Sequence, residues 1–155
     1  MEKDATTVWE LWNGDSADPS MNSGNHVMLV GDLVIWLYEH LAGIMTDLRN
    51  PGFKHVLMCP TPLGGPQFVR ARCRSPHGLI ESEWRIDSGR FDWDIRVPVN
   101  ATATVHLPAK NVNDITERGV PIRNAGGVRY LRTEGPSVIL DVKSGAYPFS
   151  TLTPV

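Results

Sequence analysis

The sequence has little cysteine, no concentrated charge of one sign and no unbroken apolar stretch of membrane length. Lys and Arg number 15 against 17 Asp and Glu, and no basic block occurs, so nucleic acid is not expected as a partner. The longest apolar stretch, residues 27–45, is interrupted by Asp32, Glu39 and His40. A bilayer span needs about 20 mostly apolar residues, so a membrane is not expected as a partner either.

Several other sequence signatures are missing. The polar opening, residues 1–4, lacks the apolar core of a secretory signal, which leaves the cytoplasm as the default location of this chain by itself and says nothing about a longer parent protein. Cys59 and Cys73 form no CxxC pair and have no histidines at metal-ligand spacing, so we expect buried free thiols rather than a disulfide. Without a phosphate cradle, a nucleophile elbow or a metal-ligand cluster, no cofactor and no metal are expected.

Turn-forming residues are plentiful, with 14 Gly and 12 Pro in 155 residues. After the turn signal at residues 50–52, short strand-like segments alternate with further turns. We therefore expect a mainly β protein whose C-terminal part is an antiparallel β-sandwich of roughly 100 residues. The predicted strands are residues 55–59, 67–74, 79–86, 91–97, 101–107, 128–134 and 138–142.

The segment 91–97 has the clearest strand pattern, because apolar and polar residues alternate along it after a hairpin signal at residues 87–90. Trp84 and Trp93 fall on the apolar parity of their strands, so we expect both in the core rather than on a carbohydrate-binding surface. Glu81 and Glu83 lie on the opposite parity. A carboxylate pair can perform acid–base chemistry, but on a wet sheet face it usually only solubilises the protein.

Residues 27–45 show apolar residues at three- and four-residue steps, which predicts a helix over this range, with Gly43 near its end. Apolar residues fill most of the other face as well, and such a helix is normally buried on all sides. No second long helix is predicted to cover it. Either the following sheet covers one side, or its packing partners belong to another part of a longer protein and the uncovered surface promotes self-association.

The residues best suited to chemistry lie ahead of this helix. Glu10 stands beside Trp9 and close to Trp12, and His26 follows at the predicted helix start. Indole rings stack on the C–H faces of sugars while a carboxylate moves protons, so this set suits a carbohydrate site. Glycoside hydrolysis normally needs two carboxyl groups, and none near Glu10 resembles its mate. The mismatch indicates part of an enzyme rather than a whole one.

Each of these residues also has a structural alternative. Glu10 can be a solvated surface carboxylate, and His26 a hydrogen-bonding group of the first helical turn rather than a donor to a ligand hydroxyl. Asp32, inside the apolar helix, is either exposed or held by a structural hydrogen bond, because a buried charge needs a partner.

An ordered series of short motifs resembles the C-terminal part of bacterial α-L-rhamnosidases of glycoside hydrolase family 78. The resemblance covers nearly the whole chain and is specific as a series rather than in any single piece. The motifs are residues 6–12 (TTVWELW), 21–26 (MNSGNH), 31–32, 36–38, 51–55 (PGFKH), 75–80 (SPHGLI), 82–84 (SEW), 98–108 (PVNATATVHLP) and 142–149 (VKSGAYPF).

The resemblance implies that residues 1–50 are the last piece of an (α/α)6 catalytic barrel and residues 51–155 the β-sandwich that follows it. The family hydrolyses terminal α-L-rhamnosyl groups with inversion, so a rhamnosylated glycan or glycoside is the implied substrate. Glu10 matches the general base, which activates water, and His26 matches a residue that contacts rhamnose. Trp9 and Trp12 would form walls of the pocket, an assignment that rests on their closeness to Glu10 in the sequence.

Two departures from the family limit what this chain is expected to do by itself. The connection from Trp12 to Met21 is shorter than usual, and the acidic motif that supplies the general acid has no counterpart. We therefore expect a C-terminal fragment of an inverting α-L-rhamnosidase that is inactive without the missing N-terminal barrel portion. The alternative is a non-catalytic β-sandwich that binds carbohydrate or supports a neighbouring domain.

Overall fold

The computed structural model describes residues 27–62 and 65–152. The chain divides into two units, Met1–Leu37 and Tyr38–Val155. The predicted site residues Trp9, Glu10, Trp12 and His26 lie outside the described residues, so their roles remain predictions.

A helical segment opens the described part of the chain. Helix α1, Val27–Trp36, continues directly as the short π-helix η1, Leu37–Leu41. Apolar side chains along it are exposed, from 37% at Tyr38 to 54% at Ile35, as expected for a helix without its packing partners. Asp32 is also exposed. Of the helices in the described ranges, none has the length and apolar character required to span a bilayer.

The predicted extension of this helix to residue 45 is wrong. The helical segment ends at Leu41, and Ile44–Thr46 forms strand β1, which pairs with β2. Gly43 has a φ of +74°, which interrupts the helix. The apolar periodicity runs on through Ile44 because that side chain is buried in a sheet, and burial alone does not distinguish a helix from a strand.

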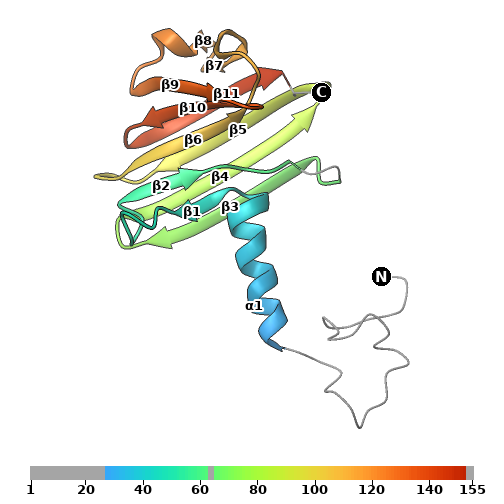
Figure 1. The fold of residues 1–155 in the computed structure, drawn as a ribbon, viewed down its shortest axis with the longest axis vertical. Helices are drawn as coiled ribbons and strands as arrows, with labels where there is room; N and C mark the ends of the chain where they lie inside the picture. The colour runs from blue at the N-terminus through green and yellow to red at the C-terminus, as the bar shows by residue number, and fades with distance from the viewer. Residues whose placement is uncertain (1–26, 63–64, 153–155) are drawn as a thin grey trace. The chain divides into compact units, whose positions relative to one another are not determined.

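Two sheets account for most of the described residues (Figure 1). The first has five strands in the order β1-β2-β6-β10-β9. Besides β1 these are β2 His55–Met58, β6 Thr102–Pro108, β10 Ser137–Val142 and β9 Val128–Glu134. Its pairs are antiparallel except β2 with β6, which is parallel.

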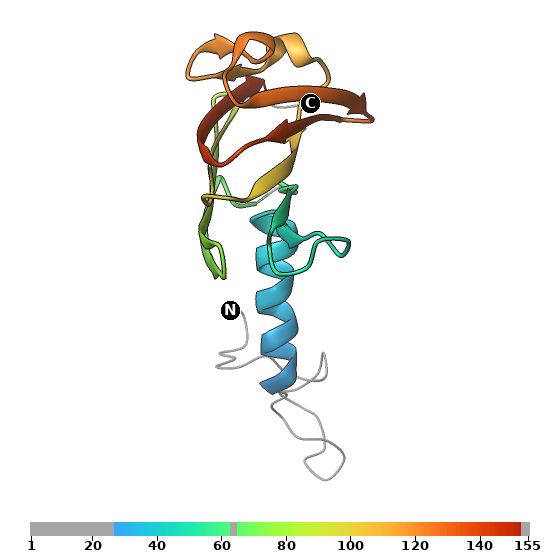
Figure 2. The ribbon, with the colours of Figure 1, turned by 90° about the vertical axis from the view of Figure 1, so that its left-hand side faces the viewer.

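The second sheet has six strands in the order β3-β4-β5-β11-β7-β8, and all its pairs are antiparallel. They are β3 Phe68–Ser75, β4 Gly78–Asp87, β5 Arg90–Val97, β11 Gly145–Leu152, β7 Thr116–Glu117 and β8 Val120–Pro121. Two 3₁₀ turns, η2 Val112–Asp114 and η3 Ile122–Asn124, flank β7 and β8. Figure 2 shows β3, β4 and β5 edge-on, forming one layer.

The mainly β sandwich fold is therefore confirmed, and several of its strands match the sequence prediction closely. Strand β5 buries every second residue, and Trp84 and Trp93 are 0% and 1% exposed, as expected of core residues. The β4–β5 hairpin turns through Ser88 and Gly89, both at positive φ. Strands β1, β7 and β8 were not predicted, because two or three residues carry no readable alternation. The eight-residue strand β11 was also missing from the strands predicted by pattern.

A line of aromatic rings forms the centre of the core between the sheets. Trp84 lies 5.9 Å from Phe91, Phe91 lies 6.1 Å from Trp93, and Trp93 lies 6.5 Å from Phe149, measured between ring centroids. Rings at this spacing bury large apolar areas and favour tilted contacts. Apolar residues of β2, β6 and β10 complete the same cluster from the five-stranded sheet.

We expect Gly43→Ala to destabilise the sandwich much more than Gly52→Ala. Both glycines have positive φ, +74° and +84°, so each alanine adds left-handed backbone strain of about 1 kcal/mol. At Gly43 the new Cβ would also stand 2.2 Å from the backbone nitrogen of Pro60, whereas at Gly52 it meets nothing within 4 Å. Urea unfolding followed by tryptophan fluorescence should show a loss of about 3 kcal/mol or more at Gly43. Equal losses at the two positions would contradict the close approach.

Candidate functional site

The described chain begins immediately after the predicted catalytic segment, because α1 starts at Val27, the residue that follows His26. The chemistry visible in the described residues is instead on the outward face of the six-stranded sheet. Two residues of that face, Glu81 and Glu83, were candidates from the sequence, and the structure shows which groups surround them.

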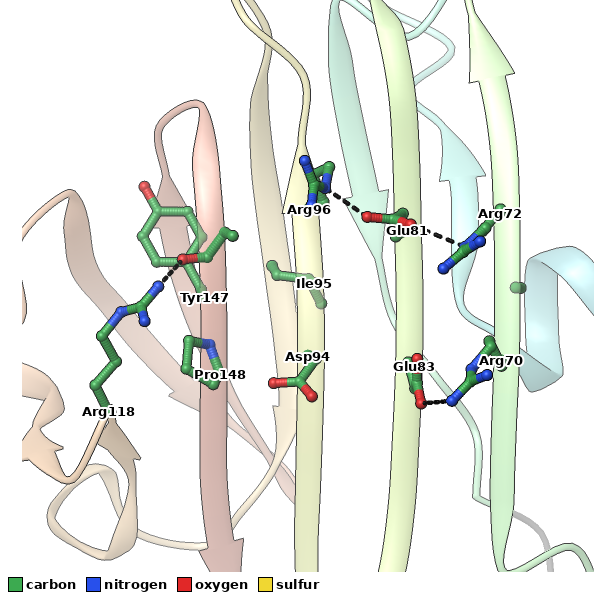
Figure 3. Close-up of a pocket in the computed structure, with 12 residues that line it drawn as sticks. Arg70, Arg72, Glu81, Glu83, Asp94, Ile95, Arg96, Arg118, Tyr147 and Pro148 are labelled. Carbon is green, nitrogen blue, oxygen red and sulfur yellow. Dashed lines mark hydrogen bonds and ion pairs between the residues drawn. The ribbon is translucent and has the colours of Figure 1, made fainter.

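Ion pairs cross the outward face of strands β3, β4 and β5 (Figure 3). Arg70 Nη2 lies 2.5 Å from Glu83 Oε1, and Arg72 Nε lies 2.8 Å from Glu81 Oε1. The other oxygen of Glu81 pairs with Arg96 of β5. The strand register causes these pairs, because Arg70 stands opposite Glu83, and Glu81 opposite both Arg72 and Arg96. Both glutamates therefore serve as partners of arginines.

A third acidic residue, Asp94 of β5, stands directly opposite Glu83 in the same sheet. The Arg70 hydrogen bond holds the pKa of Glu83 below its usual range. Partial desolvation, and then the charges of Glu83 and Asp92, raise the pKa of Asp94, while Arg118 offsets part of this rise. The pKa values of these neighbouring carboxyl groups are thus shifted in opposite directions. Such opposite shifts occur in acid–base sites, but structural ion-pair networks produce them as well.

The face is shallowly hollowed between these side chains. A depression of about 280 Å³ lies among Arg70, Glu81, Asp94, Arg118 and Pro148, which belong to four strands and the β7–β8 turn. Arg118 Nη2 donates to the carbonyl oxygen of Ala146 at 3.0 Å, and its Nε lies 3.0 Å from Glu117 Oε1. The arginines are engaged by carboxylates or carbonyls of the protein itself, which leaves them less available to an anionic ligand.

Metal or thiol chemistry has little support in the described ranges. They hold no group of three or more His, Cys, Asp and Glu that could bind a metal ion. Cys59 and Cys73 are free, as predicted, although each is half-buried rather than fully buried. Burial raises the pKa of the Cys59 thiol, so this thiol is protonated at neutral pH and is a poor nucleophile.

Two features escaped the sequence analysis although the sequence carries a signal for each. The Arg70-Ala71-Arg72-Cys73-Arg74 alternation marks a strand with one basic face. Ser82 is a polar residue at an apolar position between Ile80 and Trp84, and it is completely buried. A buried hydroxyl on an otherwise apolar face indicates a specific hydrogen bond.

Comparison with known families matches both parts of the chain. Residues 43–120 match the family model described as the bacterial alpha-L-rhamnosidase C-terminal domain. Residues 1–41 match the model described as the bacterial alpha-L-rhamnosidase 6 hairpin glycosidase domain. The two matches meet at residue 42, within the segment that links η1 to β1.

Curated relatives and solved structures agree with these matches. The alpha-L-rhamnosidase of Streptomyces avermitilis is 32% identical over 155 residues, covering 97% of this chain and 14% of the relative. That of an Alteromonas species is 34% identical over 148 residues, covering 91% and 16%. The crystal structure of the Streptomyces avermitilis enzyme complexed with L-rhamnose superposes with a TM-score of 0.81 at 30% identity, covering 97% of this chain and 14% of that one. This chain thus corresponds to about a seventh of these proteins.

The opposite pKa shifts of Asp94 and Glu83 predict stability changes of opposite sign. Asp94→Asn should stabilise the sandwich at pH 7, by no more than about 1 kcal/mol because the side chain is solvent-accessible. The folded-state pKa of Asp94 is raised, so its ionised form opposes folding above that pKa. As pH falls through the folded pKa towards the unfolded value of about 3.9, the wild type takes up a proton and the difference disappears.

Glu83→Gln is the matched control on the neighbouring strand. Its lowered pKa means that the Glu83 charge stabilises the fold above the unfolded pKa, and that this contribution is lost as pH falls through the folded pKa. The variant should therefore lose stability at pH 7 and approach the wild type in acid. Urea unfolding curves from pH 3 to 8 measure both effects, and a loss of stability in Asp94→Asn at pH 7 would contradict the assignment.

Proposed function

Because this chain belongs to the bacterial α-L-rhamnosidase family, we propose that it is the C-terminal part of an inverting α-L-rhamnosidase that hydrolyses terminal α-L-rhamnosyl groups. The observation that carries the proposal is the match of residues 1–41 to the glycosidase domain itself, beside the match of residues 43–120 to the C-terminal domain. The chain would then contain the end of the catalytic barrel as well as the sandwich. The two family matches meet near residue 42, and the boundary between residues 50 and 51 stays a prediction.

In this proposal Glu10 is the general base. It removes a proton from the water that attacks the anomeric carbon from the face opposite the leaving group. His26 donates a hydrogen bond to a rhamnose hydroxyl, and Trp9 and Trp12 wall the pocket with flat apolar surfaces. All four lie in the part of the sequence that matches the glycosidase domain.

The general acid has to come from outside this chain. In an inverting enzyme the acid and the base stand about 6.5–9.5 Å apart to leave room for the water. The chain spans 14–16% of the length of its curated relatives, so most of a barrel has no counterpart in it. The partner we propose is the N-terminal barrel portion of the parent enzyme, which would also cover the exposed apolar side chains of α1. Without it, these side chains favour self-association.

The isolated chain should release no rhamnose from an aryl α-L-rhamnoside. A chimera that joins this chain to the preceding part of the Streptomyces avermitilis enzyme should be active, because it contains both the acid and the base. In that chimera Glu10→Gln should lower kcat about 10²–10⁴-fold, the usual contribution of a general base. Circular dichroism confirms that the variant is folded. Turnover by the isolated chain, or full activity of the Glu10→Gln chimera, would refute the assignment.

A second candidate function, carbohydrate binding by the sandwich itself, has one specific observation in its favour. Phe68, at the start of β3, is 69% exposed and lines a depression of about 360 Å³ that also contains Arg85 and Asp92. An exposed ring beside groups that pair with hydroxyls is a common sugar-binding arrangement.

Titration of the isolated chain with L-rhamnose, followed by tryptophan fluorescence, separates the two candidates. If the sandwich binds sugar, binding should be saturable, should disappear in Phe68→Ala and should survive Glu10→Ala. Val99→Ala is the matched control, because Val99 is an equally exposed apolar side chain at 74% and does not line that depression. Absence of saturable binding in the wild type would remove the second candidate and leave the first unaffected.

A further inference from the structure

Four consecutive backbone carbonyls, from His40 to Gly43, are satisfied by donors of the sandwich. The backbone N–H of Thr61 donates to His40 O at 2.8 Å, and that of Cys59 donates to Gly43 O at 2.9 Å. Between them, the indole Nε1–H of Trp84 donates to Leu41 O at 2.8 Å, and Ser82 Oγ donates to Ala42 O at 2.6 Å.

The first two of these carbonyls, those of His40 and Leu41, belong to the last turn of the helical segment, and those of Ala42 and Gly43 directly follow it. The last four C=O groups of a helix have no donor in the following turn, and here the helical segment ends at Leu41. The donors arrive from strand β4 and from the residues after β2. The sandwich therefore acts as the C-terminal cap of the segment that enters it.

One of the two side-chain donors, Ser82, is itself held by a second hydrogen bond. Trp93 Nε1 donates to Ser82 Oγ at 2.9 Å, so this hydroxyl accepts one hydrogen bond while it donates another. Ser82 and Trp84 are 0% exposed, Trp93 is 1% exposed, and Ala42, which receives the serine hydrogen bond, is 1% exposed. A chain of buried hydrogen bonds of this kind has one geometry, because any displacement leaves a polar group without a partner in an apolar core.

We propose that Ser82, Trp84 and Trp93 are positioning residues of the α-L-rhamnosidase site. They hold residues 40–43 and so fix where the helical segment 27–41 ends. That segment is continuous along the chain and begins at the residue after His26, the predicted rhamnose contact. The inference rests on the proposed function, and it gives the sandwich a specific task in catalysis, which is to hold the residues at which the segment that follows His26 ends.

The test uses the active chimera and a variant that removes only a hydroxyl. Ser82→Ala leaves the carbonyl of Ala42 and the indole N–H of Trp93 without partners. Because a displaced His26 weakens sugar binding, KM for an aryl α-L-rhamnoside should rise about tenfold while kcat changes less than threefold. A displacement of about 1 Å is enough for effects of this size. Trp84→Phe, which keeps an aromatic ring and removes the donor to Leu41 O, should shift KM in the same direction.

Thr151→Val is the matched control. Thr151 is a buried hydroxyl residue of β11 in the same sheet, is 0% exposed, and makes only a 3.4 Å contact with Leu152 O. General destabilisation reduces the folded fraction, which lowers the apparent kcat and leaves KM unchanged. Thr151→Val should therefore keep the wild-type KM even where its melting temperature falls as far as that of Ser82→Ala.

Hydrogen exchange in the isolated chain gives an independent readout. The amides of Cys59 and Thr61, which donate to Gly43 and His40, should exchange at least tenfold faster in Ser82→Ala than in Thr151→Val. If Glu10→Gln inactivates the chimera but Ser82→Ala and Thr151→Val share the wild-type KM, the positioning role is wrong and the proposed function stands. If the chimera is inactive, the proposed function fails, and with it the catalytic role of these three residues. Equal exchange in the two variants shows that Ser82 does not hold the segment.

Discussion

The rest of the structure depends on how the chain passes from a helix into a sandwich. Carbonyls at a helix end need donors, and burying them without donors costs about 1–3 kcal/mol each. Here a serine hydroxyl, an indole and two backbone amides supply those donors. That indole, Trp84, and the indole of Trp93 that supports the serine hydroxyl both belong to the aromatic line that fills the core, so the apolar packing of the sandwich and the capping of the helix share these side chains. A change in the aromatic packing therefore also alters the capping of the helix, and a change in the capping alters the packing.

The two faces of the six-stranded sheet have different roles, because successive side chains along a strand point to opposite faces. Inward residues of β4 and β5 build the core, and Ser82 and Trp84 of β4 also donate to residues 42 and 41. Outward residues form ion pairs with the strands on either side. Exposed pairs of this kind contribute little to stability, and their arginines are already engaged. The outward face is therefore a solvated surface with a shallow depression. The catalytic role proposed for this chain lies in the segment ahead of α1, which matches the glycosidase domain.

Sequence patterns predicted strands β2–β6, β9 and β10 of the sandwich, most clearly where a long strand buries one face, but they missed the eight-residue β11. The alternation in β5, the hairpin at Ser88 and Gly89, and the burial of Trp84 and Trp93 were all readable, because period-two patterning directly reflects which side faces the core. Patterning failed where burial came from tertiary contacts. The end of the helix was misplaced because Ile44 is apolar in β1 for reasons unrelated to a helix, and the parallel pairing of β2 with β6 leaves no mark on either strand.

The candidate site divides in the same way. Glu10, His26, Trp9 and Trp12 were selected by residue type and by resemblance, and the family itself is shown by the matches along the chain. By itself, the sequence determined a mainly β protein with a buried aromatic core and an apolar helix before it, because composition and periodicity reflect burial directly. Only the tertiary structure decided where that helix stops and which side chains hold its end. Hydrogen bonds between residues about 40 positions apart, such as Ser82 to Ala42 and Trp84 to Leu41, arise from the folded arrangement of strands and not from local pattern.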